Sequence, residues 1–319
     1  MKAIIRERYG SADVLQLREV GKPVPPDDRV LVKIHAASVN PTDYHDMTGG
    51  LTRFMGGGLG KPKQPRFGTD FAGVVEAVGI KVTKLKPGDE VFGICPGALA
   101  EYGCALEDRV ALKPANISFE EAAAVPVAGI TALQGLRDKG GIHSGQKVLV
   151  NGASGGVGTF AVQIAKTYGT EVTAVCSTGK MDRASSIGAD HVIDYTKEDF
   201  TKNGQRYDLI CDVASTRSPF AYRGSLSPGG VCVIIGMPNL ARLPLTFILS
   251  PLSSRGGKKV GFMGIAKVTG ADLGVLAGLL EAKKVKPVIE KRYSLGETAE
   301  AVKYLQEGHA KGKIVVTVG

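Results

Sequence analysis

The pattern of hydrophobic and polar residues changes character along the chain. In the first third, short runs of β-branched residues are separated by Gly-Asp and Pro-Gly turns, which predicts several strands of a small barrel or sandwich. These strands are expected at Val30–Val39, Gly73–Gly79, Asp89–Ile94 and Arg109–Pro114. An Ala-rich segment with helical spacing then predicts one helix over Phe119–Leu136.

From Lys147 onward, strands alternate with helices. The strands are near-continuous apolar runs, as in a parallel sheet whose two faces are covered by helices. Strands of this sheet are expected at Lys147–Asn151, Glu171–Cys176, Ala189–Tyr195, Tyr207–Val213, Val231–Gly236 and Lys259–Ile265. The pattern then changes again in the tail, where we expect an extended run over Val285–Tyr293 and a closing strand at Lys313–Val318. Helices are expected at Gly156–Tyr168 and Lys180–Ile187, in a short polar stretch after Tyr195, and at Ala271–Lys284 and Gly296–Gly308. The predicted fold class is α/β, with a doubly wound parallel sheet.

The composition narrows the class of protein. The chain has 319 residues, enough for two domains, and carries 40 Lys and Arg against 31 Asp and Glu, a net charge of +9. The basic residues are spread out, and the densest patches are the short Gly256–Lys259 and Glu281–Lys286. We therefore expect a pocket for anionic phosphates and no nucleic-acid partner.

The cysteines and the apolar runs indicate the compartment. The five cysteines have no CxxC spacing, which argues for a reducing compartment and against both a disulfide framework and a zinc ribbon. The sequence starts without an apolar signal segment and has no run of eighteen apolar residues. We expect a soluble, cytoplasmic protein without a transmembrane segment.

A glycine-rich turn, Gly152–Gly158, lies between a predicted strand and a predicted helix. Gly155 and Gly158 occupy the second and third positions of the dinucleotide-binding fingerprint, and Ala153 stands in the first. Such a turn brings the backbone and the helix N-terminus close to a pyrophosphate. A tight strand–helix crossing without a ligand is the alternative. The residues expected to bind the dinucleotide here are Ser154, Gly155, Gly156, Val157 and Gly158.

The end of the next strand indicates which dinucleotide binds. An NAD site places a carboxylate there for the ribose 2′-hydroxyl, but Val172–Lys180 contains no Asp or Glu. It offers Ser177, Thr178 and Lys180 instead, and hydroxyls beside a cation suit a 2′-phosphate. The sequence therefore favours NADPH, although Lys180 as a plain surface lysine remains the alternative.

The motifs together resemble a known family. In order they are VLVKIHAASVNPTDY, FGTDFAGVVEAVG, LKPGDEVFG, AAAVPVAGITA, NGASGGVG, SIGADHVIDY, LSPGG and GKIVVTV, and they cover nearly the whole chain. Their order and spacing resemble the medium-chain dehydrogenase/reductase superfamily, in its zinc-independent quinone oxidoreductase-like branch, which includes the zeta-crystallins. The resemblance implies a GroES-like catalytic domain of residues 1–122 and 266–319 and a Rossmann NADPH-binding domain of residues 123–265. It also implies a substrate cleft at their junction and a homodimer.

The resemblance also assigns cofactor-binding residues outside the glycine turn. Thr131 matches a position near the nicotinamide and diphosphate, and Tyr195 matches one beside the adenosine phosphate. Ile235 and Gly236 end an apolar strand, where ligands of parallel sheets bind. For Lys313, contact with the cofactor and a plain strand start remain open.

Zinc alcohol dehydrogenases of this superfamily hold a catalytic zinc, which this sequence argues against. Asn40 stands where they carry a Cys, and Thr69-Asp70 stands where they carry His-Glu. Their third ligand lies near Pro126–Gly129, where no Cys, His or acid occurs. Zinc needs three N, S or carboxylate ligands, so we expect no metal and hence the reduction of an already electrophilic acceptor.

The expected reaction is hydride transfer to a quinone or to the activated C=C of an α,β-unsaturated ketone or aldehyde. By resemblance, Asn40 faces the nicotinamide, and Tyr44 is the best-placed acid to protonate the reduced acceptor. Tyr44 as a packing residue and His45 as the acid are the alternatives, and Asp43 is expected to hold the loop. The glycine-rich segment Thr48–Gln64 is either a lid over the cleft or a surface loop.

Two rival functions remain open. One is an enoyl-thioester reductase, for which the positive charge would help to hold a phosphate-bearing carrier. The other is an NADPH-binding protein with little turnover, used structurally or for RNA. The absence of Trp and the low aromatic content weaken the RNA reading.

Overall fold

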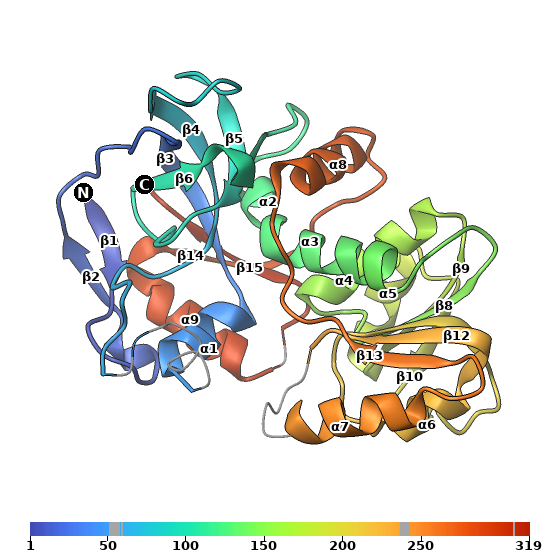
Figure 1. Cartoon of the computed structure of the whole chain (residues 1–319). Helices are drawn as coiled ribbons and strands as arrows, with labels where there is room; N and C mark the ends of the chain where they lie inside the picture. The colour runs from blue at the N-terminus through green and yellow to red at the C-terminus, as the bar shows by residue number, and fades with distance from the viewer. Residues whose placement is uncertain (51–57, 59, 237–242, 309) are drawn as a thin grey trace. The chain divides into compact units, whose positions relative to one another are not determined.

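The computed structural model describes residues 1–50, 58, 60–236, 243–308 and 310–319. The chain forms two compact units, the first of Met1–Ile130, Val268–Lys283 and Pro287–Gly319, and the second of Thr131–Lys267 and Lys284–Lys286 (Figure 1). These compact units are divided after residues 130 and 267. The domain boundaries expected from the sequence, at 122/123 and 265/266, stay predictions. Residues 51–57 and 59 of the glycine-rich segment Thr48–Gln64, expected as a lid or a surface loop, lie outside the described residues.

The first unit is built on a seven-stranded sheet. Its order is β14 (Ile289–Ser294), β15 (Lys313–Thr317), β3 (Arg29–Val39), β4 (Asp70–Val78), β5 (Glu90–Ile94) and β7 (Val110–Leu112), with β6 (Tyr102–Leu106) also paired to β3. A two-stranded sheet joins β1 (Lys2–Ile5) to β2 (Gln16–Glu19). The helices are α1 (Pro41–Thr48), α2 (Phe119–Ala123), α8 (Gly270–Glu281) and α9 (Thr298–Gln306). Alternate apolar residues of these strands, such as Val30, Val32 and Ile34, form the core.

The single helix predicted over Phe119–Leu136 is wrong. The segment forms α2, α3 (Pro126–Gln134) and a π-helical turn, Gly135–Lys139. Pro126 is the first residue of α3, because a proline cannot donate the N–H that a continuous helix would require of it.

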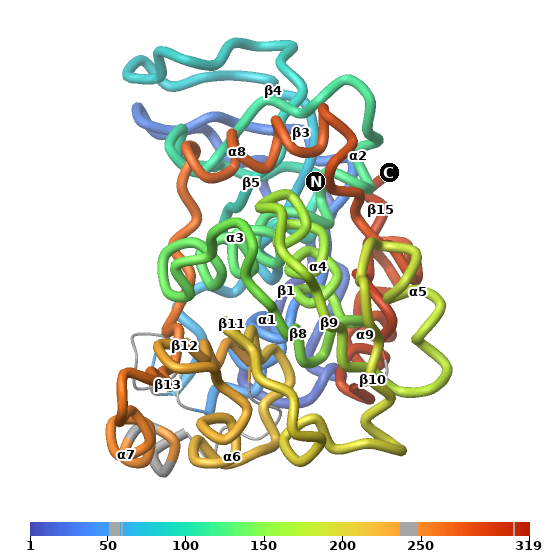
Figure 2. Tube along the Cα trace, turned by 90° about the vertical axis from the view of Figure 1, so that its right-hand side faces the viewer, coloured from blue at the N-terminus to red at the C-terminus, as the bar shows by residue number. Residues whose placement is uncertain are grey.

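The second unit contains a six-stranded parallel sheet. Its order is β10 (His191–Asp194), β9 (Glu171–Cys176), β8 (Lys147–Asn151), β11 (Tyr207–Asp212), β12 (Leu226–Ile234) and β13 (Lys259–Phe262). The helix α4 (Gly156–Thr167) lies on one face, and α6 (Pro219–Gly224) and α7 (Leu243–Ser253) lie on the other (Figure 1). The first strand, β8, lies in the middle, beside β9 and β11 (Figure 2). This is the predicted doubly wound sheet, and ligands of such sheets bind where the strand order reverses.

The short polar helix predicted after Tyr195 is wrong. Asp194 and Asp199 each accept a hydrogen bond from the backbone N–H two residues on, from Thr196 and Thr201, both 3.0 Å long. These local bonds compete with helical hydrogen bonds, so the segment forms turns.

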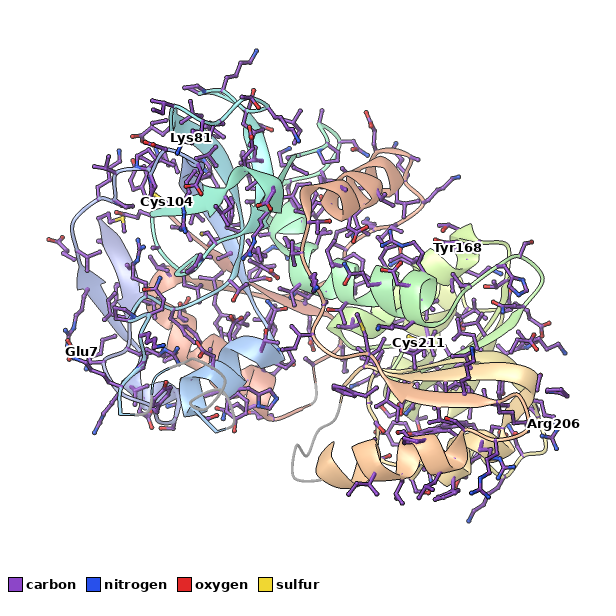
Figure 3. All side chains as sticks on the ribbon, in the orientation of Figure 1. Glu7, Lys81, Cys104, Tyr168, Arg206 and Cys211 are labelled. Atoms are coloured by element: carbon purple, nitrogen blue, oxygen red, sulfur yellow. The ribbon has the colours of Figure 1, made fainter. Side chains whose placement is uncertain are left out.

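All five cysteines are buried and free. Cys104 lies on β6 and Cys211 on β11 (Figure 3). Burial raises the pKa of every one of these thiols, to about 12 for Cys95. Across the residues placed by the structure, no helix is long and apolar enough to cross a membrane.

Candidate active site

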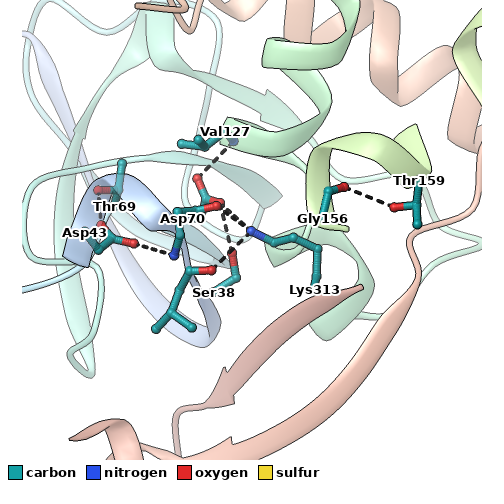
Figure 4. Close-up of polar contacts among 10 residues, drawn as sticks. Ser38, Asp43, Thr69, Asp70, Val127, Gly156, Thr159 and Lys313 are labelled. Atoms are coloured by element: carbon teal, nitrogen blue, oxygen red, sulfur yellow. Dashed lines mark hydrogen bonds and ion pairs between the residues drawn. The ribbon is translucent and has the colours of Figure 1, made fainter. Parts of the chain in front are cut away.

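A cluster of buried polar side chains lies where three strands of the first unit meet (Figure 4). The register places Ser38 of β3 opposite Asp70, the first residue of β4. The closing strand β15 runs antiparallel to β3 and begins at Lys313, beside the end of β3. Lys313 therefore meets Asn40, although the two residues are 273 positions apart.

The Asp70 carboxylate is the central acceptor of this cluster. Its Oδ2 accepts hydrogen bonds from Ser38 Oγ and Asn40 Nδ2, each 2.9 Å long, and lies 3.6 Å from Lys313 Nζ. Its Oδ1 accepts the backbone N–H of Val127 at 3.1 Å. None of the four side chains is more than 3% exposed. A buried carboxylate is thus fully satisfied by protein groups.

Lys313 supplies the positive charge of the cluster. Its Nζ donates to Asn40 Oδ1 at 2.5 Å. Burial lowers the pKa of Lys313 and raises that of Asp70, and their mutual attraction opposes both shifts. Because the Asn40 amide bonds to both members of this ion pair, its orientation is fixed.

Asp43 connects the cluster to helix α1. Its Oδ2 accepts the backbone N–H of Asn40 at 2.8 Å, and its Oδ1 accepts the Thr69 hydroxyl at 2.7 Å. Burial raises the pKa of Asp43 to about 6, against the effect of the Thr69 hydrogen bond. The predicted loop-holding role of Asp43 agrees with these contacts, which fix the N-terminus of α1.

Tyr44 and His45 follow on α1. Tyr44 is half-buried and packs against the apolar core, and its ring centroid lies 5.3 Å from that of His45. Burial lowers the pKa of His45, which favours the neutral imidazole near pH 7. Of the two rings, that of Tyr44 carries a hydroxyl, which is both a donor and an acceptor of hydrogen bonds.

The positions matched to zinc ligands form part of the polar cluster. Asn40 and Thr69 hydrogen-bond within it, and the cation beside Asp70 is the ammonium of Lys313. Within the described ranges, no group of three or more His, Cys, Asp or Glu side chains is placed to hold a metal ion.

The glycine turn of the second unit follows β8 and opens α4. Gly152 has φ +81°, a conformation that favours glycine, and a Cβ on Gly158 would lie 2.0 Å from the Gly152 carbonyl oxygen. Gly155 differs, since its backbone is extended and a Cβ there would contact only the Gly152 oxygen, at 3.6 Å. The fold requires glycine at 152 and 158 but leaves open space at 155. An N-terminus of a twelve-residue helix preceded by a residue without a side chain is an arrangement that can hold a pyrophosphate.

The predicted adenosine-binding residues lie at the carboxyl ends of neighbouring strands. Ser177 follows β9, Lys180 ends the turn after it, and Tyr195 follows β10 with a side chain that is 56% exposed. The backbone N–H of Tyr195 donates to the Cys176 carbonyl at 3.0 Å, which holds the two strand ends together. The structure thus brings these three residues to one edge of the sheet.

The remaining predicted residues lie on other parts of the second unit. Thr131 is on α3, half-buried, and Ile235 and Gly236 follow β12. A Cβ on Gly236 would lie 2.3 Å from the Val213 carbonyl oxygen, so glycine is needed where these two segments cross. Among the turn residues, Ser154 is buried and Val157 is half-buried.

Two polar residues of these sites, Ser38 and Asp194, are not among those predicted from the sequence. Ser38 is a single hydroxyl in a buried apolar strand, and Asp194 is a carboxylate at the carboxyl end of β10, 6% exposed. Each has a signal in the sequence. Ser38 is a polar residue in a strand that is otherwise apolar, and Asp194 is an acid at the carboxyl end of a parallel strand. Their partners, however, depend on the pairing of strands.

Comparisons with known proteins agree with both units. Residues 26–115 match the alcohol dehydrogenase GroES-like domain, and residues 187–316 match the family described as zinc-binding dehydrogenase. A 2-methylene-furan-3-one reductase of Solanum lycopersicum is 39% identical over 99% of this chain and 79% of its own length. An NADPH-dependent alkenal/one oxidoreductase, chloroplastic, of Arabidopsis thaliana is 35% identical with the same coverage.

A solved structure extends the likeness to the whole fold. The quinone oxidoreductase from Coxiella burnetii superimposes with a TM-score of 0.88 at 30% identity, covering 100% of this chain and 99% of that one. The GroES-like and Rossmann parts expected from the sequence are thereby confirmed. The chain belongs to the medium-chain dehydrogenase/reductase superfamily, in the branch of the quinone oxidoreductases and alkenal/one reductases.

Proposed function

We propose that this protein is an NADPH-dependent reductase of quinones or of the activated C=C bond of α,β-unsaturated ketones and aldehydes. The observation that carries the proposal is the open backbone at Gly155, where the fold leaves room for a pyrophosphate. The acceptor class rests on the relatives, which are named as 2-methylene-furan-3-one, alkenal/one and quinone reductases.

The preference for NADPH over NADH rests on the carboxyl end of β9. Ser177 and Lys180 lie there, and residues 172–180 contain no acid. A cation and a hydroxyl suit a 2′-phosphate. We place the exposed Tyr195 beside them, against the adenosine phosphate, and the turn Ser154–Gly158 with Ile235, Gly236 and Thr131 along the rest of the dinucleotide.

When bound, the nicotinamide supplies the hydride, and the chain supplies position and a proton. Hydride addition to the β-carbon of an enone leaves an enolate, which gains one proton to complete the two-electron reduction. The Tyr44 hydroxyl donates this proton, directly or through water, and regains it from solvent. Burial keeps the pKa of His45 low, so that its neutral ring is the weaker candidate.

Asn40 enters the proposal as a positioning residue. Its side chain is 2% exposed, and its amide bonds to Asp70 and Lys313. Its backbone N–H and C=O bond to Asp43, which fixes the first turn of α1. Asn40 thereby sets the direction in which Tyr44 leaves the helix, four residues on.

An enoyl-thioester reductase is the second candidate. The CurK enoyl reductase superimposes with a TM-score of 0.84 at 25% identity, covering 100% of this chain and 99% of that one. The acceptor in both candidates is a C=C bond conjugated to a carbonyl, so the difference lies in what the carbonyl is attached to.

The test follows NADPH oxidation at 340 nm without added metal. The acceptors are a para-quinone, a medium-chain α,β-unsaturated ketone and a short enoyl-coenzyme A, each tried with NADPH and NADH. Faster turnover of the quinone or the ketone with NADPH supports the proposal. Turnover of the thioester alone transfers the function to the second candidate, and turnover of none refutes both.

Replacement of Tyr44 tests the proton donor. We expect Tyr44→Phe to lower kcat for the enone by about 100-fold, because the donor is lost, with an unchanged Kd for NADPH. The matched control is His45→Gln on the same helix, which should keep kcat within a factor of about three. Steady-state rates with stopped-flow hydride transfer measure both. Full activity in Tyr44→Phe with loss in His45→Gln would assign the proton to the imidazole.

We further propose a homodimer in the cytoplasm. The helix α7 exposes Ile248 and Leu252 beside the edge strand β13, which suits burial against a second copy. For the compartment we retain the prediction from the sequence. The Arabidopsis relative is named as chloroplastic, so a fluorescent fusion in the source cell is the direct check.

A further inference from the structure

The edge of the sheet proposed to bind the adenosine end holds a carboxylate. Asp194 is the last residue of β10, and its register partner is Cys176, the last residue of β9. The segment after Cys176 is Ser177–Lys180, where the proposed function places the 2′-phosphate. An acid that lies outside residues 172–180 along the chain is therefore adjacent to them in the sheet.

Asp194 is surrounded by donors that keep it ionised. Its Oδ2 accepts the Thr178 hydroxyl, and its Oδ1 accepts the Thr196 hydroxyl at 2.7 Å and the Thr196 backbone N–H at 3.0 Å. The Lys197 ammonium lies 3.9 Å from Oδ2. Hydrogen bonds, that of Thr178 first, lower the pKa of Asp194. The carboxylate is anionic and bonded to both threonines.

The orientation of the Thr178 hydroxyl follows from this contact. A threonine hydroxyl has one proton and two lone pairs, and a carboxylate can only accept. Thr178 therefore gives its proton to Asp194 and presents lone pairs to any other partner. A 2′-phosphate is itself an acceptor with nearly two negative charges, so Thr178 offers it no hydrogen bond. The ribose 2′-hydroxyl of NADH can donate a hydrogen bond to the lone pairs of Thr178, so NADH keeps this contact.

We propose that Asp194 is a specificity-determining residue that limits the preference for NADPH over NADH by holding the proton of Thr178. The inference rests on the proposed function, which places the 2′-phosphate at Ser177–Lys180. Asp194 thus works against Lys180 at the same edge of the sheet, and the chain retains use of NADH.

Asp194→Asn tests the assignment. The amide Oδ1 still accepts from Thr196, whereas Nδ2 becomes a donor toward Thr178 and frees the Thr178 proton. We expect the Kd for NADPH and for 2′,5′-ADP to fall about tenfold, since one hydrogen bond to a charged group is gained. The Kd for NADH and for 5′-AMP should stay within about twofold. Isothermal titration calorimetry measures all four without turnover.

Two further variants separate the hydroxyl from other effects. Thr178→Val cannot donate, so in a Thr178→Val/Asp194→Asn double variant the gain for NADPH should shrink to within about twofold. Asp208→Asn removes the same charge at the amino end of β11, where Asp208 accepts the Lys147 backbone N–H at 2.9 Å, and it should leave the Kd for NADPH unchanged. Thermal unfolding confirms that each variant is folded.

The outcomes distinguish this inference from the proposed function. A loss of NADPH affinity in Asp194→Asn, an equal change for NADH, or a gain undiminished by Thr178→Val overturns the role of Asp194. A parent protein without preference for NADPH, but with a gain in Asp194→Asn, overturns the cofactor preference and supports Asp194. A parent protein that binds none of the four nucleotides overturns both.

Discussion

At the scale of residues, the cluster around Asp70 shows how a buried carboxylate is paired with a cation and surrounded by neutral donors. Two charges taken out of water are costly unless they are paired and hydrogen-bonded. Here the Asp70 carboxylate is paired with Lys313 and also accepts hydrogen bonds from Ser38, Asn40 and the Val127 N–H. The ion pair thus organises the end of β3, from which α1 and Tyr44 start.

Asp43 gives this cluster a pH dependence. The pKa of Asp43 is about 6 in the folded protein and about 4 when unfolded, so the folded state binds the proton more tightly. Protonation of Asp43 therefore stabilises the folded state below about pH 4. This contribution to the free energy of unfolding, up to about 3 kcal/mol, is lost as the pH rises from about 4 to 6. We expect Asp43→Asn to lose this slope in urea unfolding series.

The control for Asp43 is Asp27→Asn, which changes an exposed acid paired with Lys81 at 3.5 Å. Its unfolding free energy should run parallel to that of the parent between pH 4 and 6. A parallel profile for Asp43→Asn as well would contradict the assigned proton.

A site residue can be predicted from the sequence when the pattern that marks it lies within one short segment of the chain. Gly155, Gly158 and Lys180 belong to local patterns, and the structure places them at a strand end and a helix start. The contacts of Lys313 and Asp194 depend instead on which strands pair. For Lys313 that pairing spans 273 residues, so no local rule decides between cofactor contact and a strand start.

At the scale of elements, the glycines of the β8–α4 turn have different roles: Gly158 is needed for packing, and Gly155 is proposed to leave space for the cofactor. We expect Gly155→Val to raise the Kd for NADPH by at least about tenfold, because the side chain fills the space proposed for the pyrophosphate. Its thermal stability should be little changed, since the added Cβ contacts only the Gly152 oxygen, at 3.6 Å. Calorimetric binding and thermal unfolding measure the two effects.

Gly158→Ala is the matched comparison within the same turn. Its Cβ would lie 2.0 Å from the Gly152 carbonyl oxygen, so α4 must shift, at a cost of about 1–3 kcal/mol in stability. Loss of stability in Gly155→Val, or none in Gly158→Ala, would contradict this division of tasks.

Elements with a strong apolar period are predicted well, and their ends are predicted poorly. All six strands of the parallel sheet lie within runs expected from the sequence or overlap them. The two errors have local causes, the proline at position 126 and the side chain–backbone bonds of Asp194 and Asp199. In the first case one residue, and in the second case two, outweigh the average propensity of the segment.

At the scale of the whole molecule, the outer edge of β13 bears on assembly. The backbone N–H of Val260 donates to the Ser254 hydroxyl at 3.0 Å, so the residue after α7 already bonds to this edge. A second sheet could pair here only by displacing Ser254. We therefore expect side chains of α7 to contribute to the proposed dimer.

Ile248→Glu tests that expectation. Ile248 is 64% exposed on α7, and a carboxylate buried against a second copy would be unpaired. Light scattering should give twice the chain mass for the parent protein and the single mass for Ile248→Glu. Ile80→Glu, at an 87% exposed isoleucine of the first unit, should stay dimeric. A dimer in Ile248→Glu would place the interface elsewhere.

The buried cysteines have a chemical consequence for an enzyme of this kind. Quinones and enones are Michael acceptors, and the species that adds to them is the thiolate. Burial of all five thiols, with pKa values raised above the ordinary range, keeps them protonated and out of reach. The thiols of the protein, the most reactive nucleophiles toward such acceptors, are therefore protected from alkylation by its own electrophilic substrate.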